Sequence, residues 1–204
     1  MRFFHLCILT FFLLFSFNAF TKTIDEQFRE AESLIDIDQT KEALALLKTI
    51  EPTNEKQTAK QYYLLGRLYY ALGKFGKADE FYMDANLEDP TEPKYQVGLS
   101  QTSFALGKLK LSERYATSAL RDDPDLIEAE LMLAIILSHT GKKLEAEKKI
   151  LDLIKIRSTD KSLHLTYAKF LEELDLHKKA ISILEKFVII NPSSPDILDY
   201  LGRL

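Results

Sequence analysis

The pattern of apolar, small and turn-forming positions along this chain repeats every 34 residues. Small residues recur at two sets of positions, where we expect two helices to cross closely: Gly66, Ser100, Ala134 and Ala168, and Ala78, Ser112, Ala146 and Ala180. Turn-forming residues or their replacements recur at two more: Gly73, Gly107, Gly141 and Asp175, and Pro90, Pro124, Ser158 and Pro192. Such a period predicts an all-α chain of repeated helical hairpins.

Each set of positions has a physical reason. A larger side chain at a crossing position would hold the two helices of a unit apart. The glycines lie where the first helix of each unit must stop, at a site that favours a positive φ. Proline disfavours the α conformation in the residue before it, so the prolines are expected to end the second helices. The chain should therefore consist of helix pairs joined by short turns.

The segment from Tyr62 to Pro90 resembles a tetratricopeptide repeat. The residues that carry the resemblance are Leu65-Gly66, Tyr69, Gly73-Lys74-Phe75, Ala78, Tyr82, Ala85 and Asp89-Pro90, with Tyr62 where the family usually has Trp. The resemblance implies an α-α superhelix (solenoid) of about five tetratricopeptide repeats plus a partial sixth. The units are expected at about 24–58, 59–92, 93–126, 127–160, 161–194 and 195–204, the first being one residue out of register. The last ten residues are either the start of a unit that a longer chain continues or a cap over the final apolar face.

The first twenty residues have the order of a secretory signal peptide. Arg2 supplies one positive charge, and residues 3–21 carry none and are largely apolar. The cleavage site near residue 20 is poor, because Phe17 is not small. An uncleaved anchor, for which the run is marginal in length, and a buried N-terminal helix remain as alternatives. With a signal or an anchor, the repeats would be exported, in the periplasm or anchored facing it, with secretion less expected.

Composition and motifs argue against several classes of function. The formal net charge of −4 gives no basic surface, so nucleic acid is not an expected partner. The only cysteine, Cys7, lies in the N-terminal segment, and its removal would leave no thiol for a disulfide or a zinc site. We find no glycine-rich phosphate loop and no hydrolase or metalloprotease motif, and the histidines at 139, 164 and 177 are scattered. We expect no enzyme activity, no cofactor and no metal.

The resemblance also implies a binding groove lined by the first helix of each unit. Positions 2, 5, 9 and 12 of a unit should face it, and their helical spacing puts them on one helix face. The expected groove residues are Lys60, Tyr63, Arg67, Tyr70, Lys94, Val97, Gln101, Phe104, Leu131 and Ile135, with Glu128 and Ser138 at the remaining positions of the fourth unit. Because Tyr and Arg often dominate interface energetics, we expect a helix or extended segment of a partner protein along the second and third units. The alternative is that the same aromatic residues pack against the adjoining unit.

These features predict a non-catalytic scaffold or adaptor for protein–protein interaction in the bacterial cell envelope, in the assembly of an envelope, pilus or secretion-type complex. A membrane contact is expected only through an uncleaved N-terminal segment. Two alternatives remain: the docking half of a longer envelope enzyme or polysaccharide-export protein, and a secreted effector. The carboxylate clamp of chaperone-binding family members is not expected, because the matched positions contain no Asn.

Overall fold

The computed structural model describes residues 22–204, which form helices and turns without a β-strand. The helices are α2 (Ile24–Asp36), α3 (Thr40–Thr49), α4 (Glu55–Ala71), α5 (Phe75–Glu88), α6 (Pro93–Ala105), α7 (Leu109–Asp122), α8 (Ile127–His139), α9 (Lys143–Ile156), α10 (Lys161–Glu172), α11 (His177–Ile190) and α12 (Pro195–Arg203). Within this part of the chain, no helix combines the length and hydrophobicity needed to cross a bilayer. The expected signal or anchor lies outside the described residues.

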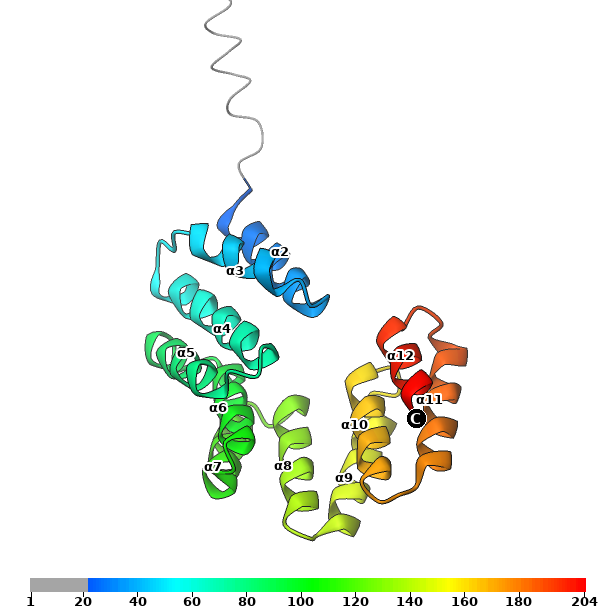
Figure 1. The fold of residues 1–204 in the computed structure, drawn as a ribbon. Helices are drawn as coiled ribbons and strands as arrows, with labels where there is room; N and C mark the ends of the chain where they lie inside the picture. The colour runs from blue at the N-terminus through cyan, green and yellow to red at the C-terminus, as the bar shows by residue number, and fades with distance from the viewer. Residues whose placement is uncertain (1–21) are drawn as a thin grey trace, which may run out of the picture.

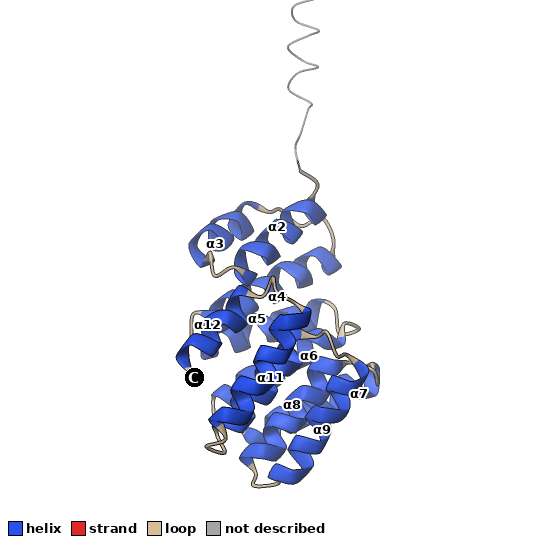
Figure 2. Ribbon diagram, turned by 90° about the vertical axis from the view of Figure 1, so that its right-hand side faces the viewer, coloured by secondary structure: helices blue, strands red, loops and turns tan. Residues whose placement is uncertain are grey.

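Consecutive helices pair into hairpins that stack into a curved array (Figure 1). The pairs are α2–α3, α4–α5, α6–α7, α8–α9 and α10–α11, and α12 packs on α11 as a further single helix. Figure 2 shows the array side-on, with helices throughout the described part of the chain. The predicted all-α solenoid of five hairpins and a partial sixth is thus confirmed.

The eight predicted crossing positions are all buried, which explains why they are small. In the third unit both are serines, and the two hydroxyls bond across the crossing. Ser100 Oγ donates to the Ser112 carbonyl oxygen at 2.8 Å, and Ser112 Oγ donates to the Ser100 carbonyl oxygen at 2.8 Å. Because an unbonded buried hydroxyl is costly, this reciprocal pair lets two serines take the place of glycine or alanine here.

The predicted turns have the backbone conformation that their residues suggest. Gly73, Gly107 and Gly141 have φ values of 68°, 74° and 85°, and Asp175 has a φ of 61°. In the first unit Asp38 takes the same conformation, with φ of 60°. It lies one residue earlier than the 34-residue period would place it, which accounts for the offset of that unit. The second helices end two residues before the predicted stops: α5 before Pro90, α7 before Pro124, α9 before Ser158 and α11 before Pro192.

The first helices of the hairpins do not stack evenly. The pairs α2–α4, α4–α6 and α6–α8 pack directly against each other. In contrast, α8 and α10 make little direct contact, and α10 packs on α9 and α11 instead. Helix α6 is the opposite extreme, because it is enclosed by α4, α5, α7 and α8 and most of its residues are buried. The concave face is therefore filled at α6 and open between α8 and α10.

Candidate functional site

The cations expected in the groove on α4 are bound by carboxylates of α2. Lys60 Nζ lies 3.2 Å from Glu32 Oε2, and Arg67 Nη1 lies 3.1 Å from Glu32 Oε1. The other guanidinium nitrogen, Arg67 Nη2, lies 2.6 Å from Asp36 Oδ1. These pairs join the first two units, so neither cation is free to receive an acidic group of a partner without giving up a partner of its own.

The two expected groove tyrosines of α4 pack against neighbouring helices. The ring of Tyr63 lies 5.8 Å from that of Tyr82 and 5.3 Å from that of Tyr95, between centroids. Tyr70 packs on Phe75, with centroids 5.2 Å apart. Burial raises the pKa of both Tyr63 and Tyr70, so the two phenols stay neutral. On α4 these aromatic residues thus contribute to packing, Tyr70 within its own hairpin and Tyr63 both within the hairpin and against α6 of the next unit.

Helix α6 places its four expected groove residues in different surroundings. Val97 departs from the expectation, because it is only 4% exposed. It packs in a cluster with Ala116, Leu126 and Met132, since α7 and α8 enclose α6. Lys94 is exposed and Gln101 is half-buried. Phe104, also half-buried, lines an open space.

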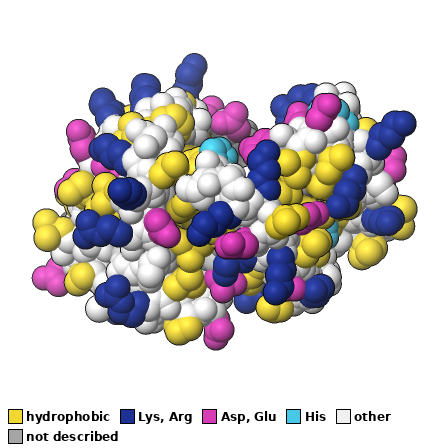
Figure 3. Space-filling view, turned by 90° about the horizontal axis from the view of Figure 1, so that it is seen from below, with side chains coloured by type: hydrophobic (Ala, Val, Ile, Leu, Met, Phe, Trp, Pro, Cys, Tyr) yellow, Lys and Arg dark blue, Asp and Glu magenta, His cyan; other side chains and the backbone are white. Residues whose placement is uncertain are grey.

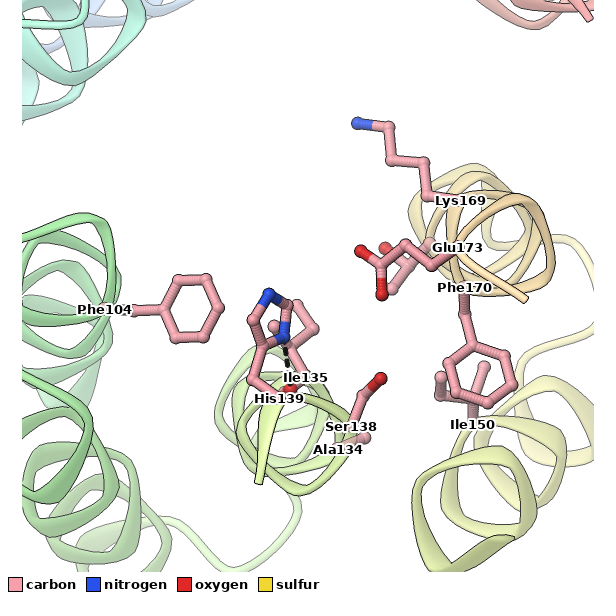
Figure 4. A pocket seen from close by; sticks show the side chains of 10 residues that line it. Phe104, Ala134, Ile135, Ser138, His139, Ile150, Lys169, Phe170 and Glu173 are labelled. Carbon is pink, nitrogen blue, oxygen red and sulfur yellow. Dashed lines mark hydrogen bonds between the residues drawn. The ribbon is translucent and has the colours of Figure 1, made fainter. Parts of the chain in front are cut away.

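That space is a pocket of about 300 Å³ between α8 and α10, shown in Figure 4 and called here the α8–α10 pocket. Its lining residues are Phe104, Ala134, Ile135, Ser138, His139, Ile150, Thr166, Lys169, Phe170 and Glu173. Phe104, Ile135 and Ser138 are the predicted groove residues that the structure brings together here. Leu131 lies nearer the N-terminal end of α8, where it lines a second hollow of about 240 Å³ together with Lys94 and Glu128.

The walls of the α8–α10 pocket are apolar and aromatic. Phe104 meets the ring of His139 edge-on, with centroids 4.6 Å apart, and His139 Nδ1 lies 3.1 Å from the Ile135 carbonyl oxygen. Phe170 and Ile150 form the deeper wall and are buried. One cation, Lys169, and one carboxylate, Glu173, lie exposed at the rim, so the opening carries charges of both signs.

The polar groups of the pocket suit binding better than bond breaking. Ser138 and His139 are adjacent on α8, and adjacent helix positions do not face each other. Figure 4 shows the imidazole turned toward Phe104 and the Ser138 oxygen turned toward α10. They therefore do not form the hydrogen-bonded pair that a serine nucleophile and its base require. In residues 22–204, no group of three or more His, Cys, Asp or Glu side chains is placed to hold a metal ion.

The α10 wall was not among the predicted site residues. Lys169 occupies position 9 of the fifth unit, so extending the groove positions by one more period would have identified it. Phe170 and Glu173 do not fall on such positions. They reach the pocket because α10 stands apart from α8, a feature of the packing that the repeat pattern does not encode.

Comparison with known proteins gives a matching family model and partial matches to curated proteins. The tetratricopeptide-repeat profile matches residues 59–92. Human protein O-mannosyl-transferase TMTC1 is 27% identical over 144 residues, which are 69% of this chain and 16% of that protein. Human protein O-mannosyl-transferase TMTC2 is 32% identical over 100 residues, which are 48% of this chain and 12% of that protein. The chain thus spans less than a fifth of the length of these curated relatives.

Solved structures give the likeness over more of the chain. A thermophilic TPR protein of Thermus thermophilus matches with a TM-score of 0.75 and 16% identity, over 89% of this chain and 98% of that one. A tetratricopeptide repeat protein of Parabacteroides merdae ATCC 43184 matches with a TM-score of 0.62 and 19% identity, over 84% of this chain and 66% of that one. At these identities the likeness shows the fold alone.

Proposed function

Because this chain is a tetratricopeptide-repeat protein, we propose that it is a non-catalytic scaffold that holds a segment of a partner protein in the α8–α10 pocket. The repeat fold itself supports a role in protein–protein interaction. The observation that carries the finer proposal is the separation of α8 from α10. At Lys60, Tyr63, Arg67 and Val97, side chains of the neighbouring units occupy the expected groove, whereas Phe104 and Ile135 line an open pocket.

The length of the open region favours a peptide segment as the occupant. The α8–α10 pocket lies toward the C-terminal end of α8, and the hollow at Leu131 lies toward its N-terminal end. At 1.5 Å per residue, the distance along α8 from Glu128 to His139 is about 16 Å. An extended chain covers that distance in about five residues at 3.3 Å each.

A photo-crosslinking amino acid at position 169 tests this function in cells that make the protein. Lys169 is exposed at the pocket rim, and we expect it to form a covalent adduct with a defined protein, identified by mass spectrometry. The matched control replaces Lys110, which is exposed on the second helix α7 and should not form that adduct. Phe104→Ala should reduce the adduct at position 169. Equal adduct yields from positions 169 and 110 would contradict the proposal. So would an adduct yield at position 169 that is unchanged by Phe104→Ala.

The chain is further proposed to act outside the cytoplasm, in the assembly of a complex in the bacterial cell envelope. The support is the order of residues 1–21, with Arg2 before a long uncharged apolar run. Fusing residues 1–30 to an alkaline phosphatase without its own signal tests it, because that enzyme needs disulfides that form only in an oxidising compartment. Phosphatase activity is the expected result, and an inactive cytoplasmic fusion would refute export.

A second candidate function is the docking part of a longer enzyme. It is favoured by the similarity to two human mannosyl-transferases over only 16% and 12% of their lengths. An antibody against residues 22–204 would detect a native protein much larger than 204 residues in that case. A native protein of the size of this chain would favour the scaffold.

A further inference from the structure

One hydroxyl points into the α8–α10 pocket without a protein partner. Although Ser138 as a whole is only 8% exposed, its Oγ is open to solvent from the pocket and makes no hydrogen bond to any of residues 22–204. Figure 4 shows this oxygen directed into the gap between α8 and α10. An occupant that displaced solvent from this oxygen would leave it unbonded, at a cost in free energy, unless it supplied a polar group of its own.

The walls around this hydroxyl suit an aromatic ring. Ile135 on α8 and Phe170 on α10 present apolar surface on the two sides of the gap, and Phe104 of α6 packs behind the His139 ring. Aromatic rings gain from edge-on or offset contacts with one another. A volume of about 300 Å³ suits a side chain and not a helix, whose diameter with side chains is about 10–12 Å.

We propose that the side chain held in the α8–α10 pocket is a tyrosine of the partner segment, with its ring against His139 and Phe170 and its phenol hydrogen-bonded to Ser138. This inference rests on the proposed scaffold function and names the chemistry that the site selects. A buried tyrosine hydroxyl needs a partner, as the hydroxyl of Ser138 does. One bond satisfies both groups.

Other side chains match the pocket less well. Phenylalanine and leucine would cover Ser138 and leave its hydroxyl unbonded, which costs free energy. A lysine or a carboxylate would need a counter-charge inside the pocket, but Lys169 and Glu173 lie exposed at its rim. Figure 3 shows charges of both signs interspersed with hydrophobic side chains on the face seen from below, so no single sign dominates it.

Two small probes that differ by one hydroxyl test the inference directly. N-acetyl-tyrosinamide and N-acetyl-phenylalaninamide are titrated into the full chain, and binding is followed by NMR chemical shifts. We expect shifts concentrated on α8 and α10, and about two- to tenfold tighter binding of the tyrosine probe, the range for one net hydrogen bond. Ser138→Ala should remove the preference and leave the affinity for the phenylalanine probe unchanged.

Thr166→Val is the matched control. Thr166 supplies another hydroxyl to the lining but is half-buried rather than enclosed, so its replacement should leave the preference intact. Equal binding of the two probes, shifts away from the pocket, or a preference that survives Ser138→Ala would overturn the assignment.

The outcome is separable from that of the proposed function. A protein adduct at position 169 combined with equal binding of the two probes would refute the tyrosine assignment but would still support the scaffold function. A preference for the tyrosine probe without any protein adduct would indicate a site for a free phenol and would refute the proposal that a partner segment occupies the pocket. Both expected results together would support a scaffold that reads a tyrosine.

Discussion

The ring of Tyr82 fills the space beside Gly98 where a side chain would begin. A Cβ built on Gly98 would stand 2.7 Å from Cδ1 of Tyr82, and one on Gly66 would stand 2.6 Å from the same atom. Tyr82 itself is 1% exposed. One aromatic ring of α5 is thus enclosed by glycines of α4 and α6, and this contact joins the second unit to the third.

Gly98→Ala should therefore destabilise the protein. The added methyl cannot be accommodated unless the enclosed Tyr82 ring moves, and overpacking of this kind costs about 1–3 kcal/mol. The gain in helix propensity, about 1 kcal/mol, offsets part of that cost of about 1–3 kcal/mol, so a net loss of up to about 2 kcal/mol is expected in urea unfolding. Gly76→Ala is the control, because nothing lies within 4 Å of its Cβ position. A loss of stability in the control as large as that of Gly98→Ala would contradict this reading.

Glu32 of α2 binds two cations of α4, Lys60 and Arg67. We expect Glu32→Gln to lower stability by about 0.2–1 kcal/mol per lost pair, because the groups are partly exposed and surface pairs contribute little. The loss should shrink as salt is raised, since salt screens exposed charges. Unfolding midpoints at low and high salt give the measurement. A loss that does not change with salt would indicate packing in place of charge.

The repeat itself could be read from the sequence, because its causes are local. The residues that cross, stop or cap a helix recur with one period, and positive φ at Gly73 and burial at Ala134 follow from them. Gly98 falls on none of these positions, because what requires a glycine there is the close approach of the Tyr82 ring from the preceding helix. Side-chain pairs between units are specific to each interface and are not set by the period.

The candidate site was predictable only in part, for the same reason. Phe104 and Ile135 are on groove positions and line the pocket. Val97 is on one too, yet the packing of α7 and α8 around α6 buries it. Where consecutive first helices separate depends on contacts between units. The small residues at Ala134 and Ala168 govern only the crossing within each unit, so they could not reveal the opening between α8 and α10.

Glu147 gives the fifth hairpin a pH-dependent contact with the fourth. Its Oε1 accepts a hydrogen bond from the Tyr167 hydroxyl at 2.8 Å and one from Lys179 Nζ at 3.0 Å. The bonds from Tyr167 and Lys179 lower the pKa of Glu147 below 4.5. A depressed folded-state pKa adds stability that is present above the unfolded value and is lost as the pH falls through the folded one. Thermal melts should show Glu147→Gln destabilising at pH 7 and converging with wild type as the pH falls through the lowered pKa of Glu147. If the stability of the variant and of wild type changed in parallel with pH, Glu147 would not be the source of this pH dependence.

Helix α12 covers the apolar face of the last hairpin through Ile197. This side chain is fully buried and belongs to a cluster with Leu171, Leu184 and Phe187. Ile197→Ala should cost about 2–5 kcal/mol, the range for such core truncations. Leu198→Ala is the control, since Leu198 is 49% exposed and its loss should change stability by less than about 0.5 kcal/mol. Equal effects of the two changes would show that α12 does not cover the core as described.

Tyr63 and Phe104 separate packing from binding on the concave face. Tyr63 is partly buried against Tyr82 of α5 and Tyr95 of α6, so Tyr63→Ala should lower stability by about 3 kcal/mol, the low end for truncating a packed aromatic ring. Phe104 is half-buried at the pocket, so Phe104→Ala should cost less stability and reduce the adduct at position 169 more. Melting temperature and adduct yield are measured on both variants under conditions where each is folded. If Tyr63→Ala abolishes the adduct while Phe104→Ala preserves it, the partner lies along α4 and not between α8 and α10.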